Sequence, residues 1–297
     1  MDAQIDFSVI IPHRDSIQYL PKLLGSIPVS KQIEIILVDN SPTPIQQDQI
    51  PTDREFTLLY SSPSRGAGGA RNVGIDHAHG KWLLFADADD FFTDDAFETF
   101  YRHIDSQAEM IYFSMDSIFQ NNGQHSVRGE QFTKLVQDYL NGQIDEYELR
   151  LGYSSPCAKM VSHSMVKEHA IRYDEVIAGN DKYFSMLCGY YAQKIEADDV
   201  FVYVATATSG SLTQRSEFKV LYSRLHVNLR YNQFLRQHNL SKYQSSIMNW
   251  LILSLKVRPS SFPKLIWLLL KFRQSPFIGF SRWGNTIKNY RKRKESA

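Results

Sequence analysis

Residues 82–90 read Trp-Leu-Leu-Phe-Ala-Asp-Ala-Asp-Asp, an apolar run of strand length that ends abruptly in three carboxylates. A strand that is buried on both faces reads as such a continuous apolar run. Asp is poor in strands and costly in a core, so the three carboxylates should emerge where the strand ends. In open α/β sheets ligands bind at that end of the strands. Asp87, Asp89 and Asp90 would there offer oxygen ligands to Mg²⁺ or Mn²⁺, ions that can in turn bind a diphosphate.

Strand and helix patterns alternate around this stretch, which predicts βαβ units and a mostly parallel sheet in an α/β fold. Apolar runs predict strands at 7–11, 33–38, 56–60, 82–86 and 110–113. Apolar spacing and capping residues predict helices at 17–27, at 69–79 and from Thr93 onward.

The pattern changes beyond residue 120. A helix is predicted over 132–140 with Gly142 at its stop position, and further elements are a helix at 180–191, a strand at 200–204 and a long helix from Phe218. Strands cease and basic residues accumulate near Ser216. We therefore expect a catalytic α/β domain at 1–215 and a helical, basic C-terminal extension at 216–297.

Composition favours a globular protein of ordinary kind, with 43% apolar and 22% charged residues among 297. Two cysteines give no disulfide framework, the first residues show no signal-peptide pattern, and no apolar run is long enough to span a membrane. These features predict a cytoplasmic protein. The net charge of +1 hides an asymmetry, because residues 256–297 contain 11 Lys/Arg and one acidic residue. A basic tail on an acidic body suggests an anionic partner.

Two candidate binding elements lie where the second and third predicted strands end. Asp39 can accept hydrogen bonds from a nucleotide base or ribose, and the alternative is a turn-forming Asp ahead of Ser41-Pro42. Residues 64–72 contain three glycines, which let a backbone approach a ligand at a helix start that binds anions. The alternative is a flexible connection with Arg71 in solvent.

Two readings also remain open for the acidic candidates. The Asp87–Asp90 cluster is either a metal site or a solvated acidic turn. Asp181 follows Gly179-Asn180 at a predicted helix start. It is either a general base that the helix N-terminus keeps ionised, or it shares with Asn180 a purely capping role.

Together these residues resemble the family-2 glycosyltransferases of the GT-A fold, over about residues 1–215. The stretches that carry the resemblance are Phe-Ser-Val-Ile-Ile-Pro at 7–12, Ile-Leu-Val-Asp at 36–39, Ala-Arg-Asn-Val-Gly at 70–74, Phe-Ala-Asp-Ala-Asp-Asp at 85–90, Pro-Cys-Ala-Lys at 156–159, Gly-Asn-Asp-Lys-Tyr-Phe at 179–184 and Ser-Gly-Ser-Leu-Thr at 209–213. Each motif is modest by itself, and the ordered set is specific.

The resemblance implies a role for each candidate. Asp39 would hold the base of a nucleotide-sugar donor, a UDP-sugar first of all, and Pro12 and Arg71 would line the nucleotide pocket. Asp87 and Asp89 would form the metal-binding Asp-x-Asp motif for Mn²⁺ or Mg²⁺, with Asp89 as the direct ligand. The resemblance also makes Asp181 the base of an inverting transfer to a glycan or lipid-linked glycan, in cell-surface polysaccharide synthesis.

Three positions depart from the family pattern and bear on the identity of the donor. His13-Arg14-Asp15 replaces an aromatic residue and an Asn, Asn40 replaces a second Asp, and Asn180 replaces a Glu. Two other functions compete: a sugar nucleotidyltransferase and a non-catalytic nucleotide-sugar or glycan-binding scaffold. The first would need a basic glycine-rich loop where residues 12–15 stand. The second has no use for intact Asp87, Asp89 and Asp181.

The C-terminal extension combines charge with apolar bulk. Residues 265–272 are mostly Leu and aromatic, and basic residues surround them and end in Arg-Lys-Arg-Lys at 291–294. This pattern predicts peripheral binding to an anionic membrane surface on the inner face of the membrane. Two alternatives are packing of the Leu-rich stretch on the catalytic domain and a solvated basic tail. No nucleic-acid recognition motif is present, and the sequence leaves the oligomeric state open.

Overall fold

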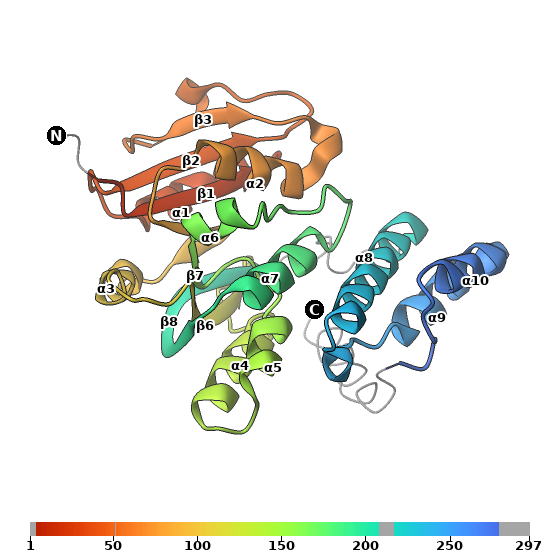
Figure 1. Cartoon of the computed structure of the whole chain (residues 1–297). Coiled ribbons are helices and arrows are strands. Elements are labelled where there is room, and N and C mark those ends of the chain that lie inside the picture. The colour runs from red at the N-terminus through yellow and green to blue at the C-terminus, as the bar shows by residue number, and fades with distance from the viewer. Residues whose placement is uncertain (1–3, 51, 208–216, 279–297) are drawn as a thin grey trace.

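The computed structural model describes residues 4–50, 52–207 and 217–278. In these ranges the strands form one eight-stranded sheet in the order β3-β2-β1-β4-β7-β6-β8-β5 (Figure 1). The strands are β1 (Phe7–His13), β2 (Ile33–Asp39), β3 (Thr57–Tyr60), β4 (Trp82–Phe85), β5 (Phe91–Phe92), β6 (Met110–Phe119), β7 (Lys159–Ser162) and β8 (Ile195–Ala207).

The first four strands run parallel, so their carboxyl ends meet at one edge of the sheet. Phe7 on β1 lies opposite Ile33 on β2 and Trp82 on β4. At the far end of the same register, His13 lies opposite Asp39. Because β4 ends at Phe85, opposite Ile10 of β1, the carboxylates that follow it emerge at the same edge of the sheet.

The second half of the sheet is mixed. β7 pairs antiparallel with both β4 and β6, β6 runs parallel to β8, and β5 pairs antiparallel with β8. Of the seven pairings in the described residues four are parallel. The predicted α/β fold with a mostly parallel central sheet is therefore confirmed.

Helices cover both faces of the sheet, and a separate apolar cluster lies under each layer. One cluster places α1 and α3 on one face, and the other places α2, α4, α5, α6 and α7 on the opposite face. The helices of this part are α1 (Leu20–Gly25), α2 (Gly66–His77), α3 (Ala96–Arg102), α4 (Glu130–Leu140), α5 (Glu146–Gly152), α6 (His163–Glu168) and α7 (Asn180–Tyr191).

Three further helices follow the sheet: α8 (Phe218–Gln237), α9 (Met248–Val257) and α10 (Phe262–Lys271). They share an apolar cluster of their own, in which Leu225 and Leu229 of α8 meet Leu251 of α9 and Leu265 and Leu268 of α10. Among the described residues, none of the helices combines the length and the apolar character needed to cross a bilayer. The motif at 209–213 and the predicted boundary near Ser216 lie outside the described residues.

The predicted helix ends at Thr93 and Gly142 have different outcomes. Thr93 does not cap the third helix, which begins at Ala96 after Asp95. Phe91 and Phe92 instead extend the sheet as β5, and the Thr93 hydroxyl donates to the carbonyl of Phe201 at 2.8 Å. Gly142 does follow the end of α4 with a φ of +67°, the left-handed conformation that a stop glycine adopts.

Candidate active site

Arg71 connects the three segments that carry the predicted acidic residues. It projects from α2 and is 5% exposed. Its Nη2 donates to Oδ1 of Asp87 at 2.5 Å, and its Nη1 donates to Oδ1 of Asn180 at 3.0 Å. The guanidinium therefore joins the end of β4 to the start of α7, where Asp181 lies. The alternative in which Arg71 is solvated is wrong.

The charge of this buried guanidinium is balanced by Asp87. Burial opposes the charged form, but the neighbouring groups together, Asp87 first and Asp181 among them, raise the pKa of Arg71. Nε of Arg71 is buried and has no hydrogen-bond partner among the described residues. A donor of this kind is costly to bury unpaired.

The glycines before Arg71 are part of the helix and not of the connection ahead of it. They lie in the first turn of α2, which begins at Gly66, three residues before the predicted start at residue 69. A Cβ atom on Gly68 would lie 2.1 Å from the carbonyl oxygen of Asp174. The absence of a side chain thus lets the segment ahead of Asp181 pack directly against α2.

Replacement of Gly68 by Ala is expected to destabilise the protein by about 1–3 kcal/mol, because backbone atoms must move to admit the methyl group. Thermal unfolding would measure the loss. Gly25→Ala is the matched control, since a Cβ there meets nothing within 4 Å. Equal unfolding temperatures for the two variants would contradict this account of α2.

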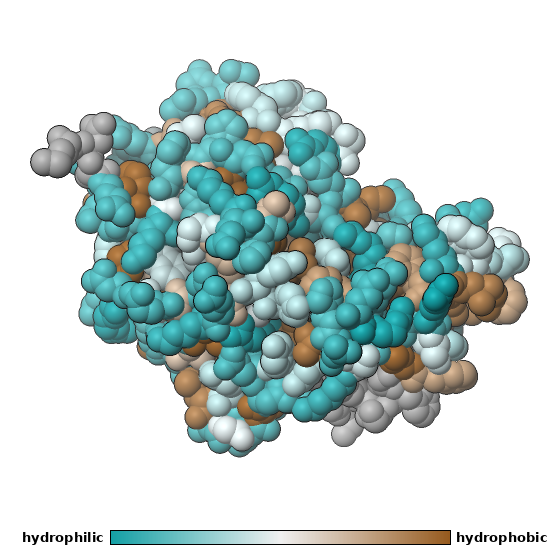
Figure 2. Space-filling view, in the orientation of Figure 1, coloured by the Kyte–Doolittle hydropathy of each residue, from teal (hydrophilic) through white to brown (hydrophobic). Residues whose placement is uncertain are grey.

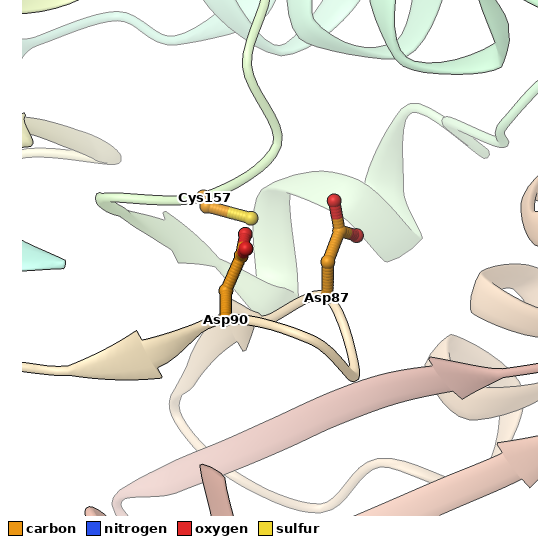
Figure 3. Close-up of side chains that lie close together, drawn as sticks. All are labelled: Asp87, Asp90 and Cys157. Atoms are coloured by element: carbon orange, nitrogen blue, oxygen red, sulfur yellow. The ribbon is translucent and has the colours of Figure 1, made fainter. Parts of the chain in front are cut away.

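Asp87, Asp90 and Cys157 form the one group in the described residues whose carboxylate and thiol atoms converge as metal ligands do (Figure 3). Their ligand atoms all lie within 4.8 Å of one another. Asp90 already accepts hydrogen bonds from the Tyr203 hydroxyl at 3.0 Å and from the Thr206 N–H at 2.7 Å. It therefore fastens the acidic turn to β8.

The chemistry of this turn suits a hard divalent cation. Burial, and then the nearby Asp87 carboxylate, raise the pKa of Asp89. Burial raises the pKa of Asp90 to about 8. Carboxylates that disfavour one another's charge in this way are stabilised by a bound cation. Burial also raises the pKa of the Cys157 thiol well above its usual value, so the carboxylates are the fitting ligands and the thiol stays protonated.

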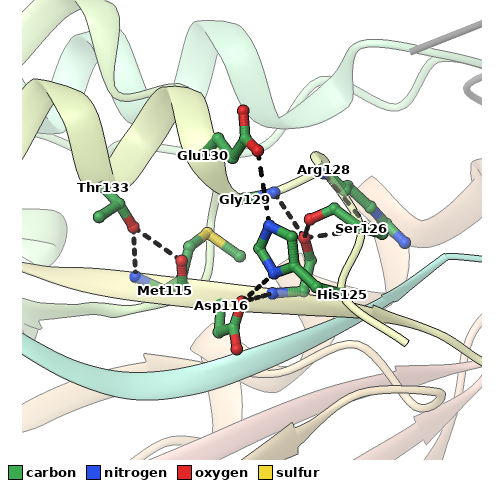
Figure 4. A network of polar contacts seen from close by, with 9 residues as sticks. Met115, Asp116, His125, Ser126, Arg128, Gly129, Glu130 and Thr133 are labelled. Atoms are coloured by element: carbon green, nitrogen blue, oxygen red, sulfur yellow. Dashed lines mark hydrogen bonds and ion pairs between the residues drawn. The ribbon is translucent and has the colours of Figure 1, made fainter. Parts of the chain in front are cut away.

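A second arginine, which sequence reasoning missed, faces the same carboxylates. Arg128 lies in the turn between β6 and α4, next to Gly129 and close to Ser126 in the chain (Figure 4). Its Nη1 donates to the carbonyl oxygen of Thr206. Burial opposes its charge, but the surrounding aspartates, Asp90 first, raise its pKa. Nothing in the local sequence around Arg128 indicates this position.

Asp181 occupies the first turn of α7. The residue that caps this helix is Gly179, which has a left-handed φ of 84°, and no side chain supplies a capping hydrogen bond. The capping alternative for Asn180 and Asp181 is therefore wrong. Burial raises the pKa of Asp181, and the charge of Arg71 opposes that rise. A partly desolvated carboxylate of this kind is a good proton acceptor.

Asp39 organises the loop that follows β2. Its Oδ1 accepts from the Ser41 hydroxyl at 2.6 Å and lies 2.9 Å from Nδ1 of His13, and its Oδ2 accepts from the N–H of Ile45 at 3.0 Å. Burial alone would raise the pKa of Asp39, but the hydrogen bonds from Ser41 and His13 lower it. The Ser41 N–H also donates to Oδ1, so the carboxylate accepts from four groups of its own chain and the turn-forming alternative is realised.

The last of the predicted site residues is Pro12. It is buried in β1 beside Val38 of β2, one residue before the His13–Asp39 pair.

A cavity of about 310 Å³ lies away from this site, between β8 and the start of α4. The predicted site residues do not line it; its walls include Thr133 and Phe201.

The sequence of the chain matches a known protein family. The family model described as Glycosyl transferase family 2 matches residues 8–169, more than half of the chain. The chain belongs to glycosyl transferase family 2. This confirms the resemblance inferred from the sequence and the predicted glycosyltransferase class. The nucleotidyltransferase and scaffold alternatives lose their support.

Several curated family members are similar at modest identity. EpsH of Bacillus subtilis is 24% identical over 232 residues, and the glycosyltransferase GlyG of Streptococcus pneumoniae is 25% identical over 235 residues. The poly(ribitol-phosphate) β-N-acetylglucosaminyltransferase TarS of Staphylococcus aureus is 25% identical over 215 residues. The matches cover 74%, 73% and 69% of this chain. They cover 66% of EpsH, 75% of GlyG and 36% of TarS, so this chain corresponds to only part of the larger relatives.

Solved structures share the fold. TarS residues 1–349 in complex with UDP-GlcNAc superimpose with a TM-score of 0.65 and 23% identity, over 90% of this chain and 80% of that one. The mannosyltransferase PcManGT of Pyrobaculum calidifontis, in complex with GDP-Man and Mn²⁺, gives a TM-score of 0.57 at 13% identity, over 97% of this chain and 88% of that one. These likenesses confirm the GT-A fold.

Proposed function

We propose that this protein is an inverting, metal-dependent glycosyltransferase that moves a sugar from a UDP-sugar to a hydroxyl group of a glycan or glycolipid acceptor. The observation that carries the proposal is the double contact of Arg71, with Asp87 on one side and with Asn180, the neighbour of Asp181, on the other. It supports the proposal because it joins the carboxylate turn after β4 and the start of α7 around one buried cation.

The fold relatives support the choice of donor and ion. TarS was solved with UDP-GlcNAc and with UDP, and PcManGT with GDP-Man and Mn²⁺. In this chain the same kind of donor would lie along the carboxyl ends of β1, β2 and β4. Pro12 and Asp39 would bound the base, and Arg71 and Asp87 would lie nearest the diphosphate.

Asp181 is the general base of the proposed reaction. It accepts the proton of the acceptor hydroxyl as the oxygen bonds to the anomeric carbon, a contribution of about 10²–10⁴-fold for a well-placed base. The bond to the diphosphate breaks on the opposite face of the sugar, so its configuration inverts. The positive charge of Arg71, which lies beside Asp87, would favour the negative charge that develops on the departing diphosphate. When bound, a Mn²⁺ or Mg²⁺ ion on Asp89 and Asp87 supplies further positive charge there.

A donor panel tests this proposal. UDP-, GDP- and dTDP-sugars are incubated with the protein and Mn²⁺, and the release of nucleoside diphosphate is measured. We expect release from one UDP-sugar, loss of that release with EDTA and recovery with Mn²⁺. Release from no donor would overturn the proposal.

Relatives named for succinoglycan biosynthesis and for poly(ribitol-phosphate) glycosyl transfer point to cell-surface polysaccharides as the setting.

The C-terminal helices support a location at the membrane. One side of α10 packs on α8 and α9, whereas the opposite side exposes large apolar residues. This outer face of α10 consists of Phe262, Ile266, Trp267 and Leu270, which are 56%, 40%, 56% and 71% exposed.

Apolar residues gather on the surface over the α9 and α10 end of the molecule (Figure 2). Lys264 and Lys271 are exposed on the same helix. A cation near an anionic lipid surface contributes about 1 kcal/mol, so apolar insertion and charge would act together. The inner side of α10 packs on α8 and α9 of the extension, and not on the sheet domain as the packing alternative supposed. The basic stretch at 291–294 lies outside the described residues.

Vesicle flotation tests the membrane role. The full-length protein is expected to float with phosphatidylserine-containing vesicles at low salt, and a Trp267→Glu, Leu270→Glu variant is expected to stay behind. Val29→Glu is the matched control, because Val29 is 85% exposed on the catalytic part. If the wild type does not float, or the double variant floats equally well, the outer face of α10 does not bind the membrane.

A further inference from the structure

The segment that leads to Asp181 is held by helix α8 of the C-terminal extension. The Ser223 hydroxyl donates a hydrogen bond to the carbonyl oxygen of Ala178 at 3.0 Å. Its oxygen also accepts one from the backbone nitrogen of Ala178 at 3.3 Å. Two turns along the same helix, Nη1 of Arg230 bonds to Oδ1 of Asp174 at 2.6 Å. Both contacts fix backbone that runs directly into α7.

Lys182, the residue after Asp181, makes the most unusual contact with the extension. Its ammonium donates to Oδ1 of Asn228 at 2.6 Å and to the Ser245 hydroxyl at 3.0 Å. It also lies 4.4 Å from the ring centroid of Tyr231. These partners are all neutral, and burial lowers the pKa of Lys182 to about 8. A desolvated cation costs folding free energy that an apolar side chain of similar size would not.

The turn between these contacts sets the direction of Asp181. Gly179 has a left-handed φ of 84°, and the side chain of Val227 on α8 lies 3.8 Å from the position that its Cβ would occupy. Ser223, Val227 and Asn228 thus follow one side of α8 along residues 178–182. The opposite contacts of α8 are with α9 and α10.

We infer that α8 and the loop at Ser245 are positioning elements of the active site: through Lys182 and Ser223 they set the geometry of Asp181. This inference rests on the proposed function, because it takes Asp181 as the base. The C-terminal helices would then be needed for the rate of transfer and not for the binding of the donor.

Steady-state kinetics of three full-length variants test the inference. Lys182→Met keeps the length of the side chain but loses its donors, and it should lower kcat about tenfold, in the range that a small misplacement of a catalytic group produces. The donor KM should stay within about twofold of the wild type. Lys182→Arg should restore most of kcat. Lys219→Met is the control, since Lys219 lies on α8 in an exposed ion pair with Glu217.

A second pair of variants keeps the test valid if Lys182→Met folds poorly. Ser223→Ala removes only the hydroxyl that meets Ala178, and it should lower kcat about threefold with an unchanged donor KM. Loss of kcat in Asp181→Asn together with normal kcat in both Lys182→Met and Ser223→Ala would overturn the inference while leaving the proposed function intact. Normal kcat in Asp181→Asn would instead overturn the proposed base and this inference with it.

Discussion

An Asp89→Asn variant is expected to lose transfer activity to the background level while it unfolds at the wild-type temperature. The carboxylate is half-buried beside Asp87, and burial together with that neighbour raises its pKa, so a bound cation would stabilise its charged form. The amide keeps the shape of the side chain but removes the charge that holds the ion. Nucleoside diphosphate release at saturating Mn²⁺ measures the loss, and Mn²⁺ titration should show weaker binding.

Asp94→Asn is the matched control for this experiment. Asp94 lies in the same acidic stretch but is exposed, and it should leave both turnover and Mn²⁺ dependence unchanged. Near-normal turnover of Asp89→Asn would show that the direct ligand is another carboxylate. In that case Asp90 and Asp87, which converge with Cys157, would become the principal candidates.

An Asp181→Asn variant is expected to lower kcat by about 10²-fold or more, with little change in donor binding. The reason is that the amide cannot take the acceptor proton, whereas the contacts of Arg71 with Asp87 and Asn180 remain. Because burial raises the pKa of Asp181, the wild-type kcat should also fall on the acid side at a pH above the usual titration of an Asp. The variant should lack that acid limb.

Exposed Glu168→Gln serves as the control for the Asp181 variant, because it also replaces a carboxylate by an amide at a helix end. A lower unfolding temperature for Asp181→Asn with an unchanged kcat would indicate a structural role. The absence of a side-chain cap on α7 argues that this outcome will not be seen.

The sequence predicts the parallel half of the sheet well for a physical reason. Buried parallel strands read as continuous apolar runs, and β1, β2 and β4 are found where these runs lie. The shorter strands could not be predicted in this way. β5 has two residues and β7 has four, and each is defined by its antiparallel partner and not by any local pattern.

The candidate site could likewise be predicted only in part. Asp87 and Asp89 could be found because an apolar run ends in them. The contacts that organise the site join residues far apart in the sequence: Arg71 with Asn180, Asp90 with Tyr203, and Arg128 with Thr206. Such pairs depend on how β4, β8 and α7 come together, and a single sequence carries no local sign of them.

The anomeric configuration of the first product tests the central claim most directly. The α-linked UDP-sugar that the donor panel selects is hydrolysed by the enzyme with Mn²⁺, and the released sugar is followed by proton NMR before its anomers equilibrate. Our account predicts that the β-anomer forms first, that EDTA abolishes its formation, and that Asp181→Asn forms it far more slowly. Release of the α-anomer first, or release that EDTA does not change, would contradict the inverting, metal-dependent mechanism.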